Sequence, residues 1–167
     1  MVQSPKVLGD NTVRVTVFSG GKKIDETCSI VSVTIHRKAN TVPYAKLILK
    51  DGEIAAGDFP ISNTDDFKPG KEIKISVGYG NDEDTIFEGI IIKHGIKITG
   101  ENYSRLVVEA RDKAVKMTIG RKNANYVAVK DSDVIKNLIG NYSALEADVA
   151  ATDTKYDELV QYYCSDW

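Results

Sequence analysis

Two acidic runs are the residues with the most obvious potential for chemistry in this sequence. The first is Asp65 and Asp66, and the second is Asp82, Glu83 and Asp84. Paired catalytic carboxylates face each other across a substrate, and one of them usually lies in an apolar pocket that raises its pKa. Both runs instead lie in polar turn sequences, and the second lacks the alternating acids and distal glutamate of a calcium loop. The pattern therefore favours solvated loop tips over a catalytic pair or a calcium site.

The other residue types that could do chemistry are isolated in the sequence. His36 and His94 have no second histidine or cysteine at ligand spacing, so a zinc site is not indicated. Cys28 and Cys164 form no Cys-x-x-Cys motif, and we interpret both as small apolar residues in a reducing compartment. Residues 78–80 (Gly-Tyr-Gly) end a strand pattern, and no helix N-terminus follows them to bind a phosphate. Since no G-x-S-x-G nucleophile elbow is present either, we predict no enzyme and no catalytic, cofactor-binding or metal residues.

Short strands separated by turns are predicted to position these residues. Apolar residues recur at every second place, which is typical of strands with one buried face, over Val13–Phe18, Ile30–Ile35, Tyr44–Leu49, Lys71–Tyr79, Ile86–Ile98 and Leu106–Ala110. Val31, Val33 and Ile35 are expected to share one face of their strand. Gly20 and Gly21 accept the positive φ of a tight hairpin, with a return strand over 22–27. One more strand is expected over 115–119.

The long strand over 86–98 favours a closed barrel. Gly89 and Gly95 are suitable places for a bulge or a sharp bend in it. A barrel also removes exposed sheet edges. Because turns are frequent and no helical period occurs before residue 130, we predict a mainly β fold with an antiparallel β-barrel.

The pattern becomes helical near the C-terminus. Asp131 or Ser132 is a suitable N-cap for a helix whose apolar residues follow helical spacing up to Gly140, a candidate C′ glycine. A second helix is expected to start near 152–154 and to carry Tyr156, Leu159, Val160 and Tyr163. We therefore assign residues 1–125 to the β-barrel domain and residues 126–167 to the start of a second, incomplete α/β domain with two helices.

Composition and charge limit the classes of partner. The chain has 167 residues and a net charge of −2, which argues against a nucleic-acid binder. No apolar run approaches the roughly 20 residues of a membrane span, and the N-terminus has no apolar signal-peptide core. Residues 58–88 hold eight acids against three lysines, whereas residues 103–131 hold seven bases against three acids. These segments either pair between copies in a head-to-tail ring contact or form ordinary solvated surfaces.

One stretch and its successors resemble a known family. Residues 40–52 (NTVPYAKLILKDG) resemble the N-x-[IV]-P-x-A-x-L-x-L-x-D-G signature of VgrG proteins, the trimeric spike proteins of type VI secretion systems. Further matching pieces follow in the same order: DFP at 58–60, FKPG at 67–70, VGY at 77–79, FEGII at 87–91, RDKA at 111–114, ELVQ at 158–161 and DW at 166–167. The resemblance covers nearly the whole chain.

The resemblance implies both a fold and a structural function. The fold is the tail-hub barrel, also found in the hubs of contractile phage tails, where three subunits with two barrels each form a ring of near six-fold symmetry. The implied function is the hub or spike base of a contractile injection machine, favouring type VI secretion over a phage tail or an extracellular injection particle. The implied partners are a hexameric tube protein resembling Hcp, further copies in a homotrimer of the full-length protein, and baseplate proteins. No cofactor is implied.

Two further expectations follow from the resemblance. The protein is cytoplasmic during assembly and is delivered outside the cell by sheath contraction, without a signal peptide. Full-length members continue past Asp166 and Trp167 through a second barrel, an oligosaccharide-binding-type domain and a β-helical spike, so we interpret this chain as an N-terminal hub fragment.

Two rival functions stay open at this point. A barrel that binds a small ligand or glycan needs a mouth with convergent aromatic and polar groups, for which Tyr79, Tyr103 and Tyr126 are candidates. A cell-wall hydrolase is the third alternative.

Overall fold

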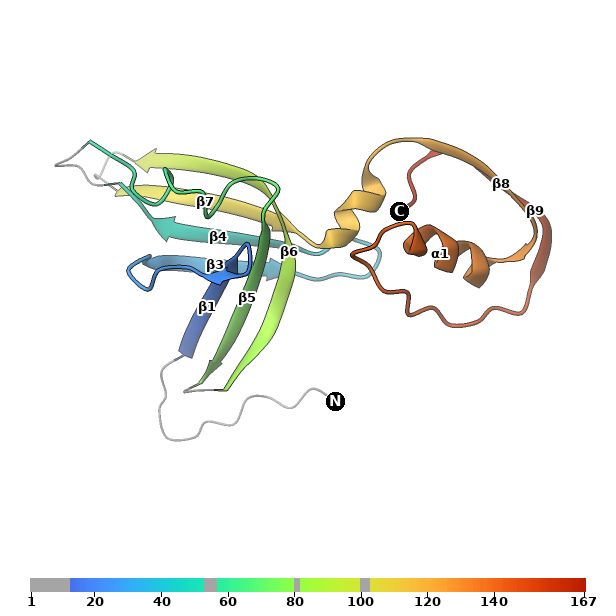
Figure 1. Cartoon of the computed structure of the whole chain (residues 1–167), viewed down its shortest axis with the longest axis horizontal. Helices are drawn as coiled ribbons and strands as arrows, with labels where there is room; N and C mark the ends of the chain where they lie inside the picture. The colour runs from blue at the N-terminus through green and yellow to red at the C-terminus, as the bar shows by residue number, and fades with distance from the viewer. Residues whose placement is uncertain (1–12, 53–56, 80–81, 100–102) are drawn as a thin grey trace. The chain divides into compact units, whose positions relative to one another are not determined.

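The chain divides into two compact units (Figure 1). The computed structural model describes residues 13–52, 57–79, 82–99 and 103–167. Unit 1 is Met1–Asp112 and unit 2 is Lys113–Trp167. The assignment of residues 1–125 to a hub domain and 126–167 to the start of a second domain stays a prediction.

Unit 1 is built on one antiparallel sheet of seven strands. The strands are β1 (Val13–Ser19), β2 (Lys22–Lys23), β3 (Ile30–His36), β4 (Tyr44–Lys50), β5 (Glu72–Tyr79), β6 (Asp82–Thr99) and β7 (Tyr103–Arg111). Their order in the sheet is β2-β1-β5-β6-β7-β4-β3. The mainly antiparallel β fold that the sequence predicted is therefore confirmed.

Strand β6 joins two halves of this sheet. Its first part, up to Ile90, pairs with β5, and its second part, from Ile90 on, pairs with β7. The two halves run in clearly different directions on either side of β6 (Figure 1). The bends were expected at Gly89 and Gly95, but the extra residues of the two β-bulges are Ile86 and Ile92. Gly89 instead permits a close approach of β7, because a Cβ there would collide with the carbonyl oxygen of Arg111.

The hydrophobic core lies between the two halves of the sheet. The half formed by β1, β5 and the first part of β6 contributes Val17, Ile73, Ile75 and Phe87. The half formed by β4, β7 and the second part of β6 contributes Ala45, Leu47, Leu49, Ile91, Leu106, Val108 and Ala110. The loop over 57–71 adds Phe67. The alternation of Ala45, Leu47 and Leu49 predicted this buried face correctly. Their exposed fractions are 1%, 1% and 0%.

Strand β3 departs from the expected alternation at Val31. The register shifts by one residue between Ile30, which pairs with Leu49, and Ser32, which pairs with Ile48. Val31 is the extra residue of this bulge and its side chain is 48% exposed, whereas Ile30 packs against the core. Val31 is therefore exposed, but it lines the same groove as Val33 and Ile35, in agreement with the prediction that the three share one face.

The sheet does not close into a barrel, which corrects the sequence prediction. Its two edge strands are β2 and β3, and no backbone ladder joins them. The expected return strand over 22–27 is reduced to Lys22 and Lys23, which pair with Ser19 and Phe18 across the Gly20–Gly21 turn. Because β2 is too short to bridge to β3, one edge of β1 stays largely uncovered.

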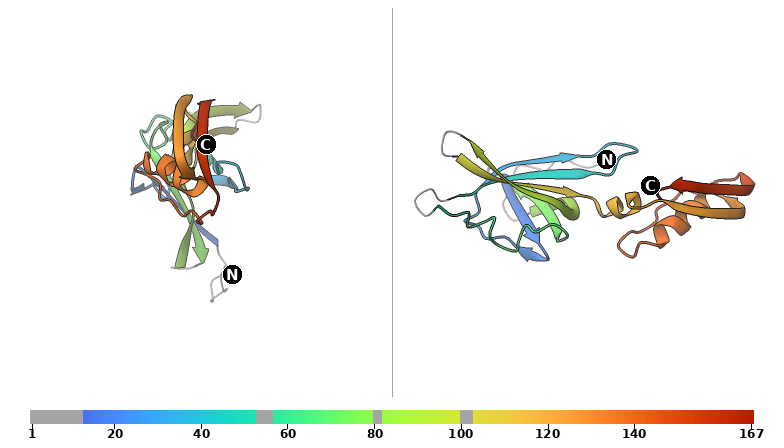
Figure 2. Two further views of the ribbon diagram at one scale, coloured as in Figure 1. Left: turned by 90° about the vertical axis from the view of Figure 1, so that its right-hand side faces the viewer. Right: turned by 90° about the horizontal axis from the view of Figure 1, so that it is seen from above.

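Unit 2 combines a two-stranded ribbon with one helix. Its elements are the 3-10 helix η1 (Lys113–Thr118), β8 (Lys122–Lys130), α1 (Asp131–Gly140) and β9 (Lys155–Cys164). Strands β8 and β9 pair antiparallel, and α1 lies along one face of the ribbon (Figures 1 and 2). The first predicted helix is confirmed. The second predicted helix is wrong, since its residues form β9, and the strand expected over 115–119 is largely η1.

The ends of α1 differ in detail from the predicted caps. Lys130 occupies the N-cap position and makes no side-chain cap. Asp131 lies in the first turn, where a carboxylate is favoured by the helix dipole. The backbone N–H of Ser132 donates to the hydroxyl of Thr152 at 3.2 Å, so the segment after the helix supplies the missing acceptor. Gly140 is the last helical residue, and Asn141 follows it with right-handed φ and ψ.

Candidate assembly surfaces

The first acidic run lies in the exposed loop before β5. The carboxylate of Asp65 forms an ion pair with Lys68, with 2.5 Å between Oδ1 and Nζ. Hydrogen bonding by Lys68 is the main cause that lowers the pKa of Asp65. The backbone carbonyl of Asp66 accepts a hydrogen bond from the hydroxyl of Ser19. Asp65 thus stabilises a turn within the loop, and Asp66 holds the loop against β1.

The second acidic run forms the start of β6. Glu83 is fixed by β1: its Oε1 lies 3.5 Å from Nε of Arg14 and accepts a hydrogen bond of 2.8 Å from Thr16. Asp82 and Asp84 flank Glu83, point to the other face of the strand by alternation, and are exposed. We call Asp82 and Asp84 the acidic tip.

The histidines and cysteines form no metal site in the part of the chain that the structure describes, where no cluster of three possible ligands occurs. His36 stacks on Tyr44 with ring centroids 4.6 Å apart. His94 lies on β6 opposite Val108. Burial is the first cause that raises the pKa of the Cys28 thiol, which disfavours the reactive thiolate.

The Asp51–Gly52 pair in the 40–52 stretch organises the loop that covers the core. Asp51 is 3% exposed, and its carboxylate accepts hydrogen bonds from the N–H groups of Gly52, Ile61 and Ser62 at 2.9, 3.0 and 2.8 Å, and from the Ser62 hydroxyl. Burial opposes ionisation, but these donors outweigh it and lower the pKa of Asp51. Gly52 has φ of +102°, and a Cβ there would collide with the Ser104 hydroxyl. The pair therefore has a structural role.

The outer face of β4, β7 and the second part of β6 is strongly basic. By alternation, this face carries six bases and one acid: Lys46, Lys50, Lys93, Lys97, Arg105, Arg111 and Glu109. Near one end, the Arg111 guanidinium lies over the Tyr44 ring at 6.0 Å. In the next row, Nζ of Lys93 lies 3.6 Å from the carboxylate of Glu109, which is flanked on its other side by Lys46.

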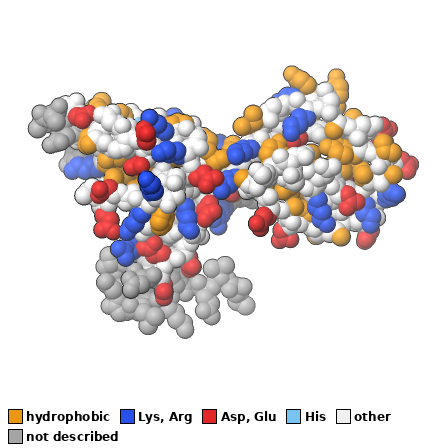
Figure 3. Space-filling view, viewed as in Figure 1, with side chains coloured by type: hydrophobic (Ala, Val, Ile, Leu, Met, Phe, Trp, Pro, Cys, Tyr) orange, Lys and Arg blue, Asp and Glu red, His pale blue; other side chains and the backbone are white. Residues whose placement is uncertain are grey.

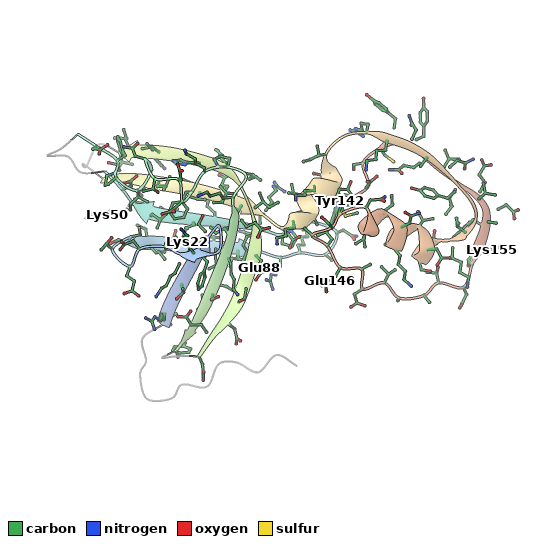
Figure 4. All side chains as sticks on the ribbon, in the orientation of Figure 1. Lys22, Lys50, Glu88, Tyr142, Glu146 and Lys155 are labelled. Carbon is green, nitrogen blue, oxygen red and sulfur yellow. The ribbon has the colours of Figure 1, made fainter. Side chains whose placement is uncertain are left out.

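The last row of this face consists of bases alone. Arg105 on β7 pairs directly with Lys50 on β4 and with Lys97 on β6, and all three side chains are exposed. Figure 4 labels Lys50 at the end of its strand. Like charges directly opposite each other destabilise a sheet. No carboxylate among the described residues forms an ion pair with any of the three. We call Lys50, Arg105 and Lys97 the basic row.

An open groove lies at the seam where the sheet fails to close. It has a volume of about 710 Å³ and is lined mainly by aliphatic residues of β1 and β3, including Val13, Val15, Val33 and Ile35. Neither Tyr79 nor Tyr126 lines it, and the side chain of Tyr103 lies outside the described residues. The structure therefore does not bring the three candidate tyrosines together around this groove.

Unit 2 contains a buried polar cluster at Asp166. Its carboxylate accepts hydrogen bonds from Tyr142 at 2.6 Å, from Gln161 at 2.9 Å and from Lys122, with which it forms an ion pair. Tyr142 is labelled in Figure 4. Burial opposes ionisation of Asp166, but these donors outweigh it and lower its pKa. The backbone N–H of Asp166 also donates to Met117 at 3.1 Å. Gln161 and Asp166, both in family-like stretches, thus have structural roles.

The basic row was missed by the sequence analysis because its members come from three separate strands. Charge counting found the basic segment over 103–131, but Lys50 and Lys97 lie outside it. A signal was available for one pair: Lys97 and Arg105 lie symmetrically about the turn after β6, so a hairpin register would have placed them opposite each other. Lys50 could be added only from the pairing of β4 with β7.

Comparison with solved structures shows which fold this is. A tail protein from Neisseria meningitidis MC58 matches with a TM-score of 0.59 at 15% identity over 87% of this chain and 39% of its own. The prophage MuSo2 43 kDa tail protein from Shewanella oneidensis matches with a TM-score of 0.63 at 11% identity, over 89% of this chain and 44% of its own. The E. coli c3393 protein matches with a TM-score of 0.61 at 10% identity, over 93% of this chain and 40% of its own. It is described as a type VI secretion component similar in structure to the T4 bacteriophage tail proteins gp27 and gp5.

These similarities establish a tail-hub fold, and the chain spans about two fifths of the length of these proteins. In the described residues, no helix combines the length and the apolar character needed to cross a bilayer. No curated protein sequence matches this chain. The family that does match, over residues 9–167, differs from the VgrG family that the sequence resembled. The chain belongs to the Alg8 N-terminal domain family.

Proposed function

We propose that this chain is a structural part of a contractile injection machine, the hub at the base of its spike. The carrying observation is that 87–93% of the chain superposes on proteins described as phage tail or type VI secretion components. In this role the domain docks onto the end of a hexameric tube, and the full-length protein carries the spike and forms a homotrimer. Baseplate proteins are further partners. A type VI system is the favoured context, and a phage tail or an extracellular injection particle is the alternative.

Several features of unit 1 support an assembly role without catalysis. The buried carboxylate of Asp51 is used by backbone and hydroxyl donors of its own loop. The carboxylate of Glu83 is used by β1. The outer face of β4, β7 and the second part of β6 carries six bases and one acid along three strands, and so extended a charged surface suits a protein partner better than a small substrate. The seam groove is lined mainly by aliphatic residues, with Glu26, Ser29 and Ser32 as its polar side chains, and no aromatic side chain among the described residues lines it. The proposal places the protein in the cytoplasm during assembly and outside the cell after sheath contraction.

The direct test is binding to the tube. The full chain, and a longer parent if its gene encodes one, is mixed with the hexameric tube protein of the same genome, and complexes are sought by light scattering and electron microscopy. We expect density of this protein at the ends of tubes. If tubes form normally and no complex occurs at any salt concentration tried, the proposal is wrong.

A pair of matched variants tests whether binding requires the folded state of unit 1. Leu47→Ala is expected to destabilise the core of unit 1 and to weaken binding, whereas Val31→Ala removes an exposed side chain and is expected to leave binding unchanged. Equal binding by both variants would point to adhesion through unit 2 or through unfolded chain.

A further inference from the structure

The two ends of β6 carry opposite charges that cannot meet within one chain. The acidic tip, Asp82 and Asp84, lies at its start, and Lys97 of the basic row lies near its end. Figure 1 shows these two ends of β6 at opposite ends of unit 1. At about 3.3 Å per residue, the bent strand between Asp84 and Lys97 has a contour length of roughly 40 Å, which is the upper limit of their separation along it. An attraction between these groups therefore has to be intermolecular.

Each of the two charged groups lacks an internal partner in the described part of the chain. Glu83, between the two aspartates, is fixed by Arg14 and Thr16 and orients the tip. No ion pair of Asp82 or Asp84 is found among the described residues. The three neighbouring bases of the basic row repel one another, and no carboxylate among the residues that the structure describes forms an ion pair with them. In contrast, Lys74 and Glu88 on the same sheet form a pair 3.8 Å apart.

The spacing of the two groups is also complementary. Asp82 and Asp84 are two residues apart on one face of a strand, which separates them by about 6.6 Å. The members of the basic row are neighbours across strands, about 5 Å apart, so the whole row spans about 10 Å. Two carboxylates of the tip thus fit within the span of three bases.

From this complementarity we propose that the basic row receives the acidic tip of a second copy of this chain. The contact joins opposite ends of β6 and is heterologous, because the two patches differ; repeated, it produces a ring if the rotation closes and a filament if it does not. The proposed function would give this contact its place in a hub ring, so its biological role rests on that proposal. The contact itself does not depend on tube binding.

The test uses neutralising variants of the full chain. The row variant is Lys50→Gln with Arg105→Gln, and the tip variant is Asp82→Asn with Asp84→Asn. Sedimentation velocity at about 50 mM salt, where screening is moderate, should show concentration-dependent association of the unchanged protein. Each variant alone should associate at least about tenfold more weakly, and about 500 mM salt should have a similar effect.

Mixing the two variants gives the decisive outcome. The row variant keeps an unchanged acidic tip, and the tip variant keeps an unchanged basic row. One molecule of each can therefore form a single contact, and neither can bind a further molecule. We expect a 1:1 dimer that does not grow with concentration. Lys116→Gln with Lys136→Gln, and Asp148→Asn with Asp157→Asn, remove the same charges from exposed positions in unit 2 and should not change association.

Three results would overturn the proposal. One is an unchanged protein that stays monomeric at low salt and high concentration. Another is association that survives in either variant, which would mean that another surface is the partner. The third is a mixture without a dimer while both variants keep the circular dichroism spectrum of the unchanged protein. Tube binding that fails while self-association persists would count against the proposed function alone.

Discussion

The two units are stabilised by different kinds of interaction. Unit 1 has a continuous core of buried aliphatic and aromatic residues contributed by both halves of its sheet. In unit 2, all of whose residues are described, Met117 is the one hydrophobic side chain that is buried, whereas Ser132 and Asp166 are buried polar residues. On the view of Figure 3, hydrophobic side chains of unit 2 gather on its outer surface over the ribbon. Unit 1 thus depends on apolar burial, and unit 2 depends on hydrogen bonds and on the ion pair between Lys122 and Asp166.

This difference predicts which substitutions each unit tolerates. Removing apolar volume is most costly where the core is dense, because a cavity adds to the lost transfer free energy. Removing one member of a buried polar cluster is most costly where its partners then lack hydrogen bonds. Trp167, the single tryptophan, lies in unit 2, so its fluorescence reports that unit separately.

The largest effect is expected from Leu47→Ala. Leu47 is 1% exposed and lies on β4 between the core residues of β7 and β3. The free energy of unfolding of unit 1 should fall by about 3 kcal/mol. Urea unfolding followed by circular dichroism should show the loss, while the Trp167 fluorescence transition stays in place. A shift of both transitions by the same amount would show that the units unfold as one and would break the comparison.

The next largest effect is expected from Asp166→Ala. This change leaves Lys122, Tyr142 and Gln161 without their shared acceptor. The free energy of unfolding of unit 2 should fall by about 2 kcal/mol, since hydrogen bonds to a charged group are involved. The Trp167 transition should move to lower urea while the transition of unit 1 does not. Asp157→Ala, on the exposed side of β9, is the control and should change neither.

Acid should weaken the two units through different carboxylates, among which Asp51 in unit 1 and Asp166 in unit 2 are buried. The pKa of Asp166 and of Asp51 is lowered below the ordinary value of 3.8. A lowered pKa stabilises the folded state above pH 3.8, and this stabilisation is lost as the pH falls below 3.8 through the folded-state pKa. Asp166→Asn should therefore flatten the acid dependence of the Trp167 transition, and Asp51→Asn that of unit 1. If either substitution changed the acid dependence of the other unit instead, the separation of the two units would be wrong.

The sequence predicted those parts of the fold that depend on local alternation. The period of two in Ala45, Leu47 and Leu49 identified the buried face of β4, and helical spacing identified α1. Closure of the barrel could not be predicted in this way, because it depends on how many residues of a return strand find partners. Lys22 and Lys23 pair with β1, and Ile24 adds one backbone hydrogen bond to Val17. The bulge at Val31 is likewise a property of the pairing between β3 and β4.

Strand β9 shows where spacing alone misleads. Tyr156, Leu159, Val160 and Tyr163 fit a helical period, but tyrosine and valine also favour strands. The outcome was decided by the ladder with β8, in which Leu159 pairs with Tyr126 and Val160 with Asn125. The basic row and the acidic tip are of the same kind: their residues are visible in the sequence, but their arrangement exists only once the register is known.

The smallest effect has the most specific sign. Arg105→Gln should stabilise unit 1 by a few tenths of a kcal/mol at low salt, because it relieves repulsion from Lys50 and Lys97. Lys93→Gln, on the same face, should destabilise it slightly, because the pair with Glu109 is lost. Urea midpoints at about 10 mM and 500 mM salt distinguish the two, since screening should reduce both differences. The midpoints are measured at concentrations where the protein is monomeric. If Arg105→Gln destabilised the protein there, Arg105 would stabilise the fold of the single chain. The presence of the basic row would then be explained without a binding partner.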